Sequence, residues 1–150
     1  MRIKDSIIFA LLVPILSFSQ IKISDIGNWK PKIEEAIELI KVTDSAKYDL
    51  LIDNCDNIEF IIGDFSTTKP PKTILINTRD LRLNSVNDIA AALVHESYHL
   101  YLYSKCEELT ERAEELICYQ YEYTFLCKLP SVEGWLFKNV IDMMIFYNKK

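Results

Sequence analysis

Apolar side chains recur with the period of an amphipathic helix in several stretches of this sequence. The clearest are residues 31–42, 86–103 and 110–128, where apolar positions three and four residues apart alternate with charged ones. A fourth stretch, with Ser131 as its expected cap, runs to residue 145. A shorter segment, 46–54, is expected to add one or two helical turns. The pattern therefore predicts about four helices of substantial length.

Two shorter stretches have the composition of β-strands. Residues 58–62 are rich in β-branched and aromatic side chains, and residues 73–77 repeat that composition. Residues 66–72, which contain two adjacent prolines, are expected to form a loop. A connection of this length favours an antiparallel pair, and such a pair needs helices on one face to be stable in water. We predict an α+β fold in which a small antiparallel β-sheet packs on about four helices.

The length and charge of the chain limit its organisation and its partners. A chain of 150 residues, 49% of them hydrophobic, is long enough for one domain with a single core and too short for two. The formal net charge is −5, and Lys and Arg form no cluster beyond the first few residues. Because proteins bind phosphate backbones through clustered positive charge, we expect no nucleic-acid partner.

The first residues have the pattern of a secretory signal peptide. Arg2 and Lys4 precede the uncharged apolar stretch 7–16, and Ser17 and Ser19 provide small side chains before a cleavage site. A bilayer span takes roughly 20 apolar residues, which is longer than this stretch. We therefore expect a signal peptide at 1–19, cleavage near Ser19 and Gln20, and export to the periplasm or the medium. The single domain would then be residues 20–150, with no membrane span.

Four cysteines remain in that domain, at positions 55, 106, 118 and 127. Their spacing matches no paired-cysteine zinc ribbon. Cys118 and Cys127 lie nine residues apart in one predicted helix, roughly 13 Å along its axis, so they cannot pair with each other. Any disulfide must be long-range, for example Cys55 with Cys106. Burial as small apolar side chains would suit Cys118 and Cys127 equally well.

The two histidines of the chain lie in one helical turn, as His95-Glu96-Ser97-Tyr98-His99. Histidines four residues apart on a helix project from one face and can give two imidazole nitrogens to one zinc ion. The glutamate after the first histidine cannot bind the same ion, but it can reach a water molecule beside it. This HExxH spacing predicts a zinc site in which Glu96 is the general base.

A catalytic zinc site keeps three protein ligands and an open position for water, so two histidines leave it one ligand short. No third histidine exists in the chain, and the remaining ligand should be a carboxylate. If the helix with the motif and the next helix form an antiparallel hairpin, Glu111, Glu114 and Glu115 lie level with the histidines. A salt-bridging acidic surface would be the alternative explanation for these three glutamates.

The motif and its surroundings resemble the gluzincins, zinc metallopeptidases in which HExxH precedes a helix with a Glu-x-x-small ligand motif. Here Glu115-Leu116-Ile117-Cys118 fits that form, although the family commonly has alanine where this chain has Cys118. The resemblance covers about 58–128 and is closest to the small minigluzincin-like peptidases. It implies Glu115 as the third ligand, with Glu111 as a residue that orients a histidine and Glu114 as the second choice of ligand.

The resemblance further implies a hydrolase that uses one catalytic zinc ion to cleave the peptide bonds of a peptide or protein substrate. In such enzymes the strand before the motif lies at the cleft edge and pairs with an extended substrate, and residues 73–77 would take that place. Tyr119 would stabilise the oxyanion. Two other functions stay open. One is a zinc amidase acting on a non-peptide substrate, and the other is a non-catalytic or latent zinc protein with an inhibitory or regulatory partner.

Overall fold

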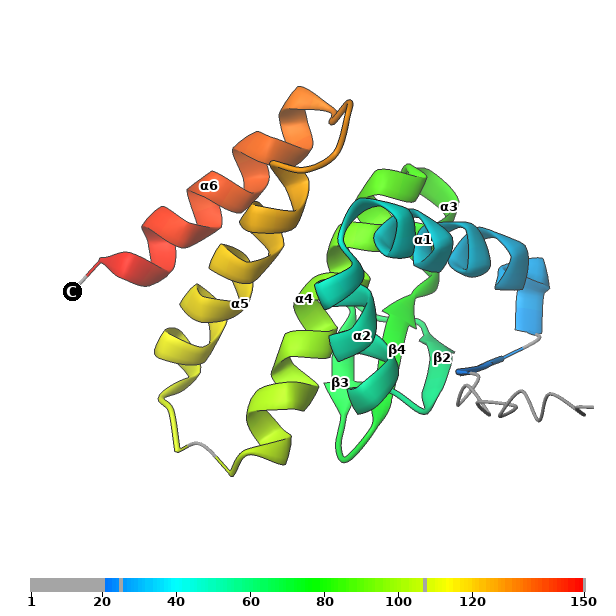
Figure 1. Ribbon diagram of the computed structural model, residues 1–150, viewed down its shortest axis with the longest axis horizontal. Coiled ribbons are helices and arrows are strands. Elements are labelled where there is room, and N and C mark those ends of the chain that lie inside the picture. Colours follow the sequence, from blue (N-terminus) through cyan, green and yellow to red (C-terminus); the bar gives the residue numbers. More distant parts are fainter. Residues whose placement is uncertain (1–20, 25, 107, 150) are drawn as a thin grey trace, which may run out of the picture.

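The computed structural model describes residues 21–24, 26–106 and 108–149 (Figure 1). The predicted signal peptide, 1–19, lies outside these ranges. The α+β fold is confirmed, because the described part contains six α-helices and one four-stranded sheet. The strands are β1 (Lys22–Ile23), β2 (Asn57–Ile61), β3 (Thr67–Lys69) and β4 (Thr73–Asn77). The helices are α1 (Lys30–Thr43), α2 (Ser45–Asn54), α3 (Thr78–Leu83), α4 (Val86–Ser104), α5 (Glu111–Leu126) and α6 (Gly134–Asn148), with a short 3-10 turn at Ile26–Asn28.

The sheet is mixed, and its strand order is β1-β2-β4-β3. Strands β2 and β4 pair in parallel, with Ile58 opposite Ile74, so the predicted antiparallel pairing of 58–62 with 73–77 is wrong. The reason lies in the segment 66–72, which was predicted to be a loop. It contains β3, which turns back and takes the antiparallel position beside β4, with Thr68 opposite Ile74. β4 is consequently an interior strand, and β3 is the edge strand nearest the histidine motif.

Helix α4 is the centre of the helical layer. It packs against α1 and α2 on one side and α5 on another, while α6 lies on the far side of α5 (Figure 1). Ala90 and Ala91 are fully buried on α4, and such small side chains let neighbouring helices approach closely. Leu93 and Val94 fill the core beside them. The turn that carries the histidines is therefore held by packing on several sides.

The helix ends follow the capping chemistry of the sequence in most places. The Ser85 side chain accepts a hydrogen bond from the Asp88 backbone N–H and so caps α4, the helix that carries the motif. The predicted cap at Ser131 is wrong, since α6 begins at Gly134 with Glu133 in the cap position. Ser131 lies instead in the connection between α5 and α6, where its backbone carbonyl accepts a hydrogen bond from the Asn87 side chain of α4.

All four cysteines are free, so a disulfide between Cys55 and Cys106 is wrong. Cys55 is buried at the end of α2, whereas Cys106 is exposed beyond the end of α4. Cys118 is buried, as expected for a small apolar side chain, and Cys127 is exposed. Within the described ranges, we find no helix that combines the length and the apolar character needed to cross a membrane.

Asp44 lies between α1 and α2 and also links them to the end of α5. Its carboxylate caps α2 by accepting from the Lys47 backbone N–H, and it accepts a hydrogen bond of 2.8 Å from Lys128, beyond the end of α5. Burial alone would raise the pKa of Asp44, but these bonds outweigh it and hold the pKa below its usual value. Ionised Asp44 should therefore stabilise the fold at neutral pH.

We predict that Asp44→Ala lowers the free energy of unfolding at pH 7 by about 1–3 kcal/mol, because a cap and a charge-assisted hydrogen bond are lost. Because the folded-state pKa is depressed, this contribution is present above the unfolded pKa of about 3.9 and is lost as the pH falls through the lower folded value. Urea unfolding of the wild type and of Asp44→Ala at pH 7 measures the loss of stability, and the same measurement at pH 2–3 tests whether the loss disappears. Asp49→Ala, an exposed change on α2, is the control, and an equal loss there would contradict the prediction.

Candidate metal centre

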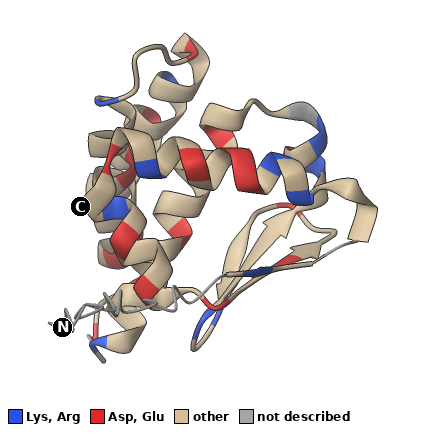
Figure 2. Ribbon diagram, turned by 45° about the vertical axis from the view of Figure 1, so that its right-hand side comes forward, with Lys and Arg blue, Asp and Glu red and all other residues tan. Residues whose placement is uncertain are grey.

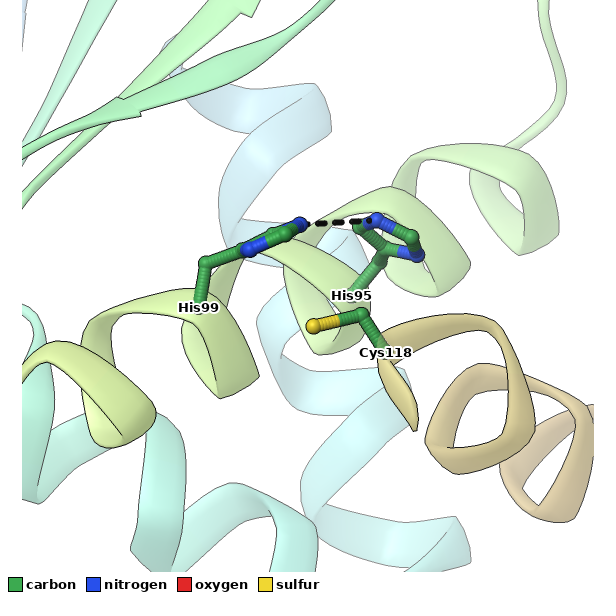
Figure 3. Close-up of side chains that lie close together, drawn as sticks. All are labelled: His95, His99 and Cys118. Atoms are coloured by element: carbon green, nitrogen blue, oxygen red, sulfur yellow. Dashed lines mark hydrogen bonds between the residues drawn. The ribbon is translucent and has the colours of Figure 1, made fainter. Parts of the chain in front are cut away.

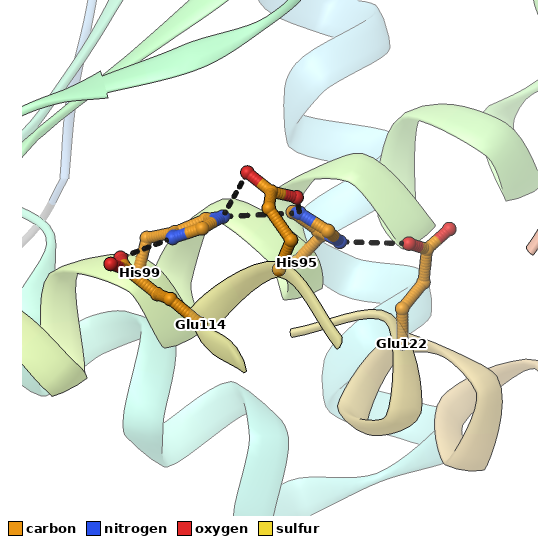
Figure 4. Close-up of polar contacts among 5 residues, drawn as sticks. His95, His99, Glu114 and Glu122 are labelled. Atoms are coloured by element: carbon orange, nitrogen blue, oxygen red, sulfur yellow. Dashed lines mark hydrogen bonds and ion pairs between the residues drawn. The ribbon is translucent and has the colours of Figure 1, made fainter. Parts of the chain in front are cut away.

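The two imidazole rings of the motif face the same point. His95 and His99 are one helical turn apart on α4, and their Nε2 atoms lie 3.2 Å from each other (Figure 4). Two nitrogens bound to one tetrahedral zinc ion at about 2.0 Å are themselves about 3.3 Å apart. The spacing of the two Nε2 atoms therefore fits a shared zinc ion.

Glu115 extends from α5 to the same point. One carboxylate oxygen lies 3.5 Å from Nε2 of His95, and the other lies 3.5 Å from Nε2 of His99. Burial would raise the pKa of Glu115, but the hydrogen bond to His95 and the charges of His95 and His99 together outweigh it and hold the pKa below its usual value. The structure therefore brings the three residues expected to bind metal together, with the carboxylate in its ligating, ionised form.

Cys118 also lies at this cluster, one turn after Glu115. Its sulfur and one nitrogen of each histidine are all within 4.8 Å of one another (Figure 3). Sequence reasoning assigned Cys118 only the role of a small side chain. Burial raises the pKa of its thiol far above the usual value, and a thiol must lose its proton to bind zinc. Because its carboxylate is already ionised, Glu115 fits the third position better than Cys118.

Two other glutamates of α5 hold the outer nitrogens of the histidines. Glu114 lies 2.7 Å from Nδ1 of His99, and Glu122 lies 3.0 Å from Nδ1 of His95 (Figure 4). With a carboxylate as acceptor, each Nδ1 carries a proton and donates a hydrogen bond, so in the neutral imidazole the Nε2 lone pair is free for a metal. This tautomer is the one a zinc site requires.

The orienting role predicted for Glu111 is therefore wrong, and it belongs to Glu114 and Glu122. Glu111 lines the outer part of the cleft, and no contact with either imidazole is found for it in the described residues. Sequence reasoning missed Glu122, although it lies seven residues after Glu115 and hence on the same helical face. That spacing was the available signal.

The carboxylates around His95 favour its protonated form. Burial lowers the pKa of His95, but the hydrogen bonds to Glu115 and Glu122 outweigh it and raise the pKa to about 10. Metal binding requires a neutral imidazole, so it would displace this proton. Glu122, which stabilises the protonated form of His95, is also the group that would hold the ring in place beside a metal ion.

Glu96 projects beside the cluster and not into it. Only 8% of its surface is exposed, and its carboxylate accepts no hydrogen bond from the residues that the structure describes. Burial raises the pKa of Glu96, against the attraction of His95 and His99, which lower it. A buried carboxylate whose pKa is raised towards neutrality suits a group that takes and returns a proton.

Two adjacent cavities open at this point. The larger, about 240 Å³, lies on the His99 side and is lined by Thr67 and Thr68 of β3 and by Glu111. The smaller, about 150 Å³, lies on the His95 side, and Ser66 and Glu96 line both cavities. The cleft edge is therefore formed by β3, and the expectation that 73–77 would form it is wrong, because β3 covers that side of β4.

Tyr119 lies beside the cluster, where sequence reasoning expected it. Its ring meets the ring of His95 edge-on, with 4.4 Å between centroids, and stacks on Tyr147 at 5.9 Å. Burial raises the pKa of the phenol, so it is a neutral donor at physiological pH. Tyr119 lines the smaller cavity together with His95.

Comparisons with known proteins do not identify this chain, since no family model, no curated protein and no solved structure matches it. The resemblance to gluzincins therefore stays a prediction. The distances between the described side chains are the basis for any functional conclusion.

We predict that Glu122→Ala and Glu114→Ala each weaken zinc binding about 10–100-fold, because an imidazole that loses its orienting carboxylate is less basic and less fixed. Zinc titration against a competing chelator measures the affinity, and circular dichroism verifies the fold. Glu111→Ala removes the same charge from the same helix without touching a histidine, and it should leave the affinity unchanged. Equal weakening by all three substitutions would mean that only net charge matters.

Proposed function

We propose that this protein is a zinc-dependent metallopeptidase, a hydrolase of peptide bonds. The observation that carries the proposal is the mutual distance of three ligand groups. Nε2 of His95, Nε2 of His99 and the carboxylate of Glu115 are separated by 3.2, 3.5 and 3.5 Å. These values match the edges of a zinc tetrahedron, about 3.3 Å, and the fourth corner is left for water.

The chemistry would divide among the residues as follows. A zinc ion on His95, His99 and Glu115 would supply a Lewis acid that activates water and polarises the scissile carbonyl. Glu96, beside both cavities, takes the proton of the attacking water and passes it to the leaving amine. The Tyr119 phenol donates a hydrogen bond to the oxygen that becomes negative.

The outer residues keep the site in one geometry. Glu114 and Glu122 fix the tautomer and the rotation of the imidazoles, so little reorganisation is needed when the charge of the reacting groups changes. On the His99 side, β3 offers a strand edge whose Thr67 and Thr68 line the larger cavity. We infer that an extended substrate pairs with this edge, which is the usual way that a free strand binds a peptide.

Two rival functions use the same ligands. A zinc amidase would activate water in the same way on a non-peptide amide, and a non-catalytic zinc protein would need the ligands without a base. The position of Glu96 favours a hydrolase over the second rival. A structural or partner-binding zinc site gains nothing from a carboxylate held between the two cavities beside the ligands, and burying most of such a group costs stability.

We predict that Glu96→Gln retains one zinc ion per chain and hydrolyses peptides about 10²–10⁴-fold more slowly than the wild type. This is the factor that general-base catalysis contributes. Hydrolysis of casein or of a peptide library measures the rate, and metal analysis measures the zinc. Glu115→Ala is the comparison, and it should lose zinc and activity together.

Two results would contradict the proposal. A Glu96→Gln protein as active as the wild type would remove the general base from the mechanism. A zinc-loaded wild-type protein that cleaves no peptide in a broad library, while Glu96→Gln behaves identically, would leave the binding role or the non-peptide amidase.

A further inference from the structure

The smaller cavity, on the His95 side of Glu96, has walls suited to a particular kind of side chain. Phe65 and Tyr119 give it two aromatic walls, and Ala92 and Leu136 give it apolar ones. Its volume of about 150 Å³ is the size that holds a benzene molecule in other proteins. A long side chain of a substrate can therefore enter it with apolar contacts along its stem.

Three carboxylates line this cavity, together with the imidazole of His95 and the neutral polar groups of Ser66, Tyr119 and Asn139. Asp88, Glu96 and Glu122 line it, and no Lys or Arg lines either cavity in the described part of the chain. Acidic residues also recur along the helices around it (Figure 2). Clefts lined by one sign of charge concentrate ligands of the opposite sign.

The carboxylates retain capacity to bind a cation. Asp88 accepts a hydrogen bond from Asn84, and Glu122 accepts one from Nδ1 of His95, whereas an ionised carboxylate can accept about four. Glu96, more than nine-tenths buried, accepts none from the described residues. The cavity therefore contains acceptor positions that this chain leaves unused.

The negative charge would persist with metal in the site. Asp88 touches none of the proposed zinc ligands, so its carboxylate would stay available to a cationic side chain with a metal ion bound. Burial raises the pKa of Asp88 to about 6, which leaves the carboxylate ionised above that pH. The aromatic walls add an attraction for a cation that lies over a ring face.

We propose that this cavity is a specificity pocket for a lysine or arginine side chain of the substrate, next to the scissile bond. This inference rests on the proposed peptidase function and deepens it. Asp88 and Glu122 bind the cationic end, and Phe65 and Tyr119 contact the aliphatic stem. The substrate class is then peptides with a basic residue on the His95 side of the cleaved bond.

Asp88 is the residue that tests the pocket with least damage to the chemistry. It lies two helical turns before His95. Its carboxylate accepts a hydrogen bond from Asn84, and its backbone N–H donates one to Ser85. Asp88→Asn keeps the shape and removes the charge. Asp49→Asn, on the exposed side of α2, removes the same charge outside the cleft.

The experiment compares kcat/KM of the zinc-loaded full chain for peptides that differ at one position, lysine against the neutral, similarly long norleucine. We expect the wild type to prefer lysine about tenfold or more, the factor that a charge-assisted hydrogen bond provides. Asp88→Asn should lower this preference about tenfold, and Asp49→Asn should leave it unchanged. Calorimetry in a Glu96→Gln background should give the same ranking for peptide affinity without turnover.

A second variant keeps the test decisive if Asp88→Asn fails to fold. Asn139 is exposed on α6 and lines the cavity, so Asn139→Lys places a positive charge at its wall and should also reduce the lysine preference. Active protein with no lysine preference, or with a preference for free N-termini alone, would overturn the pocket and leave the peptidase intact. Absence of any peptide cleavage or binding would overturn both proposals.

Discussion

The contact between α4 and α5 is the constraint on which the site depends. It brings Glu114, Glu115 and Glu122 of α5 against His95 and His99 of α4. Buried ionisable groups are tolerated only when they are paired, and here each imidazole nitrogen faces a carboxylate oxygen. The network therefore both joins the two helices and sets the geometry that a metal ion requires.

The rest of the fold keeps this contact in place and shapes the space beside it. The buried alanines of α4 allow α1 and α2 to pack closely behind the histidines. On the open side, β3 forms one edge of the cleft, and residues of α6 close the smaller cavity. The described residues thus build two walls around the cluster.

Helical periodicity predicted the first and last residues of α4 and α5 to within about two positions. The HExxH spacing correctly predicted that His95 and His99 face one point. The strand pairing of the sheet was not predictable in the same way. The connection of about ten residues between β2 and β4 contains β3, and no pattern in its sequence indicates that strand. The orienting pairs depend on how α5 crosses α4, which periodicity does not specify, and Glu111 was chosen where Glu114 and Glu122 serve. Export rests on the sequence pattern of 1–19 alone.

The central claim is that two histidines and Glu115 form one zinc site. A crystal structure of the zinc-loaded protein, with anomalous scattering recorded at the zinc edge, tests it most directly. The account predicts one ion per chain, with Nε2 of His95 and of His99 at about 2.0–2.1 Å and a Glu115 oxygen at about 2.0–2.2 Å. A sulfur ligand from Cys118 at about 2.3 Å in place of Glu115, or no ion between the histidines, would contradict it.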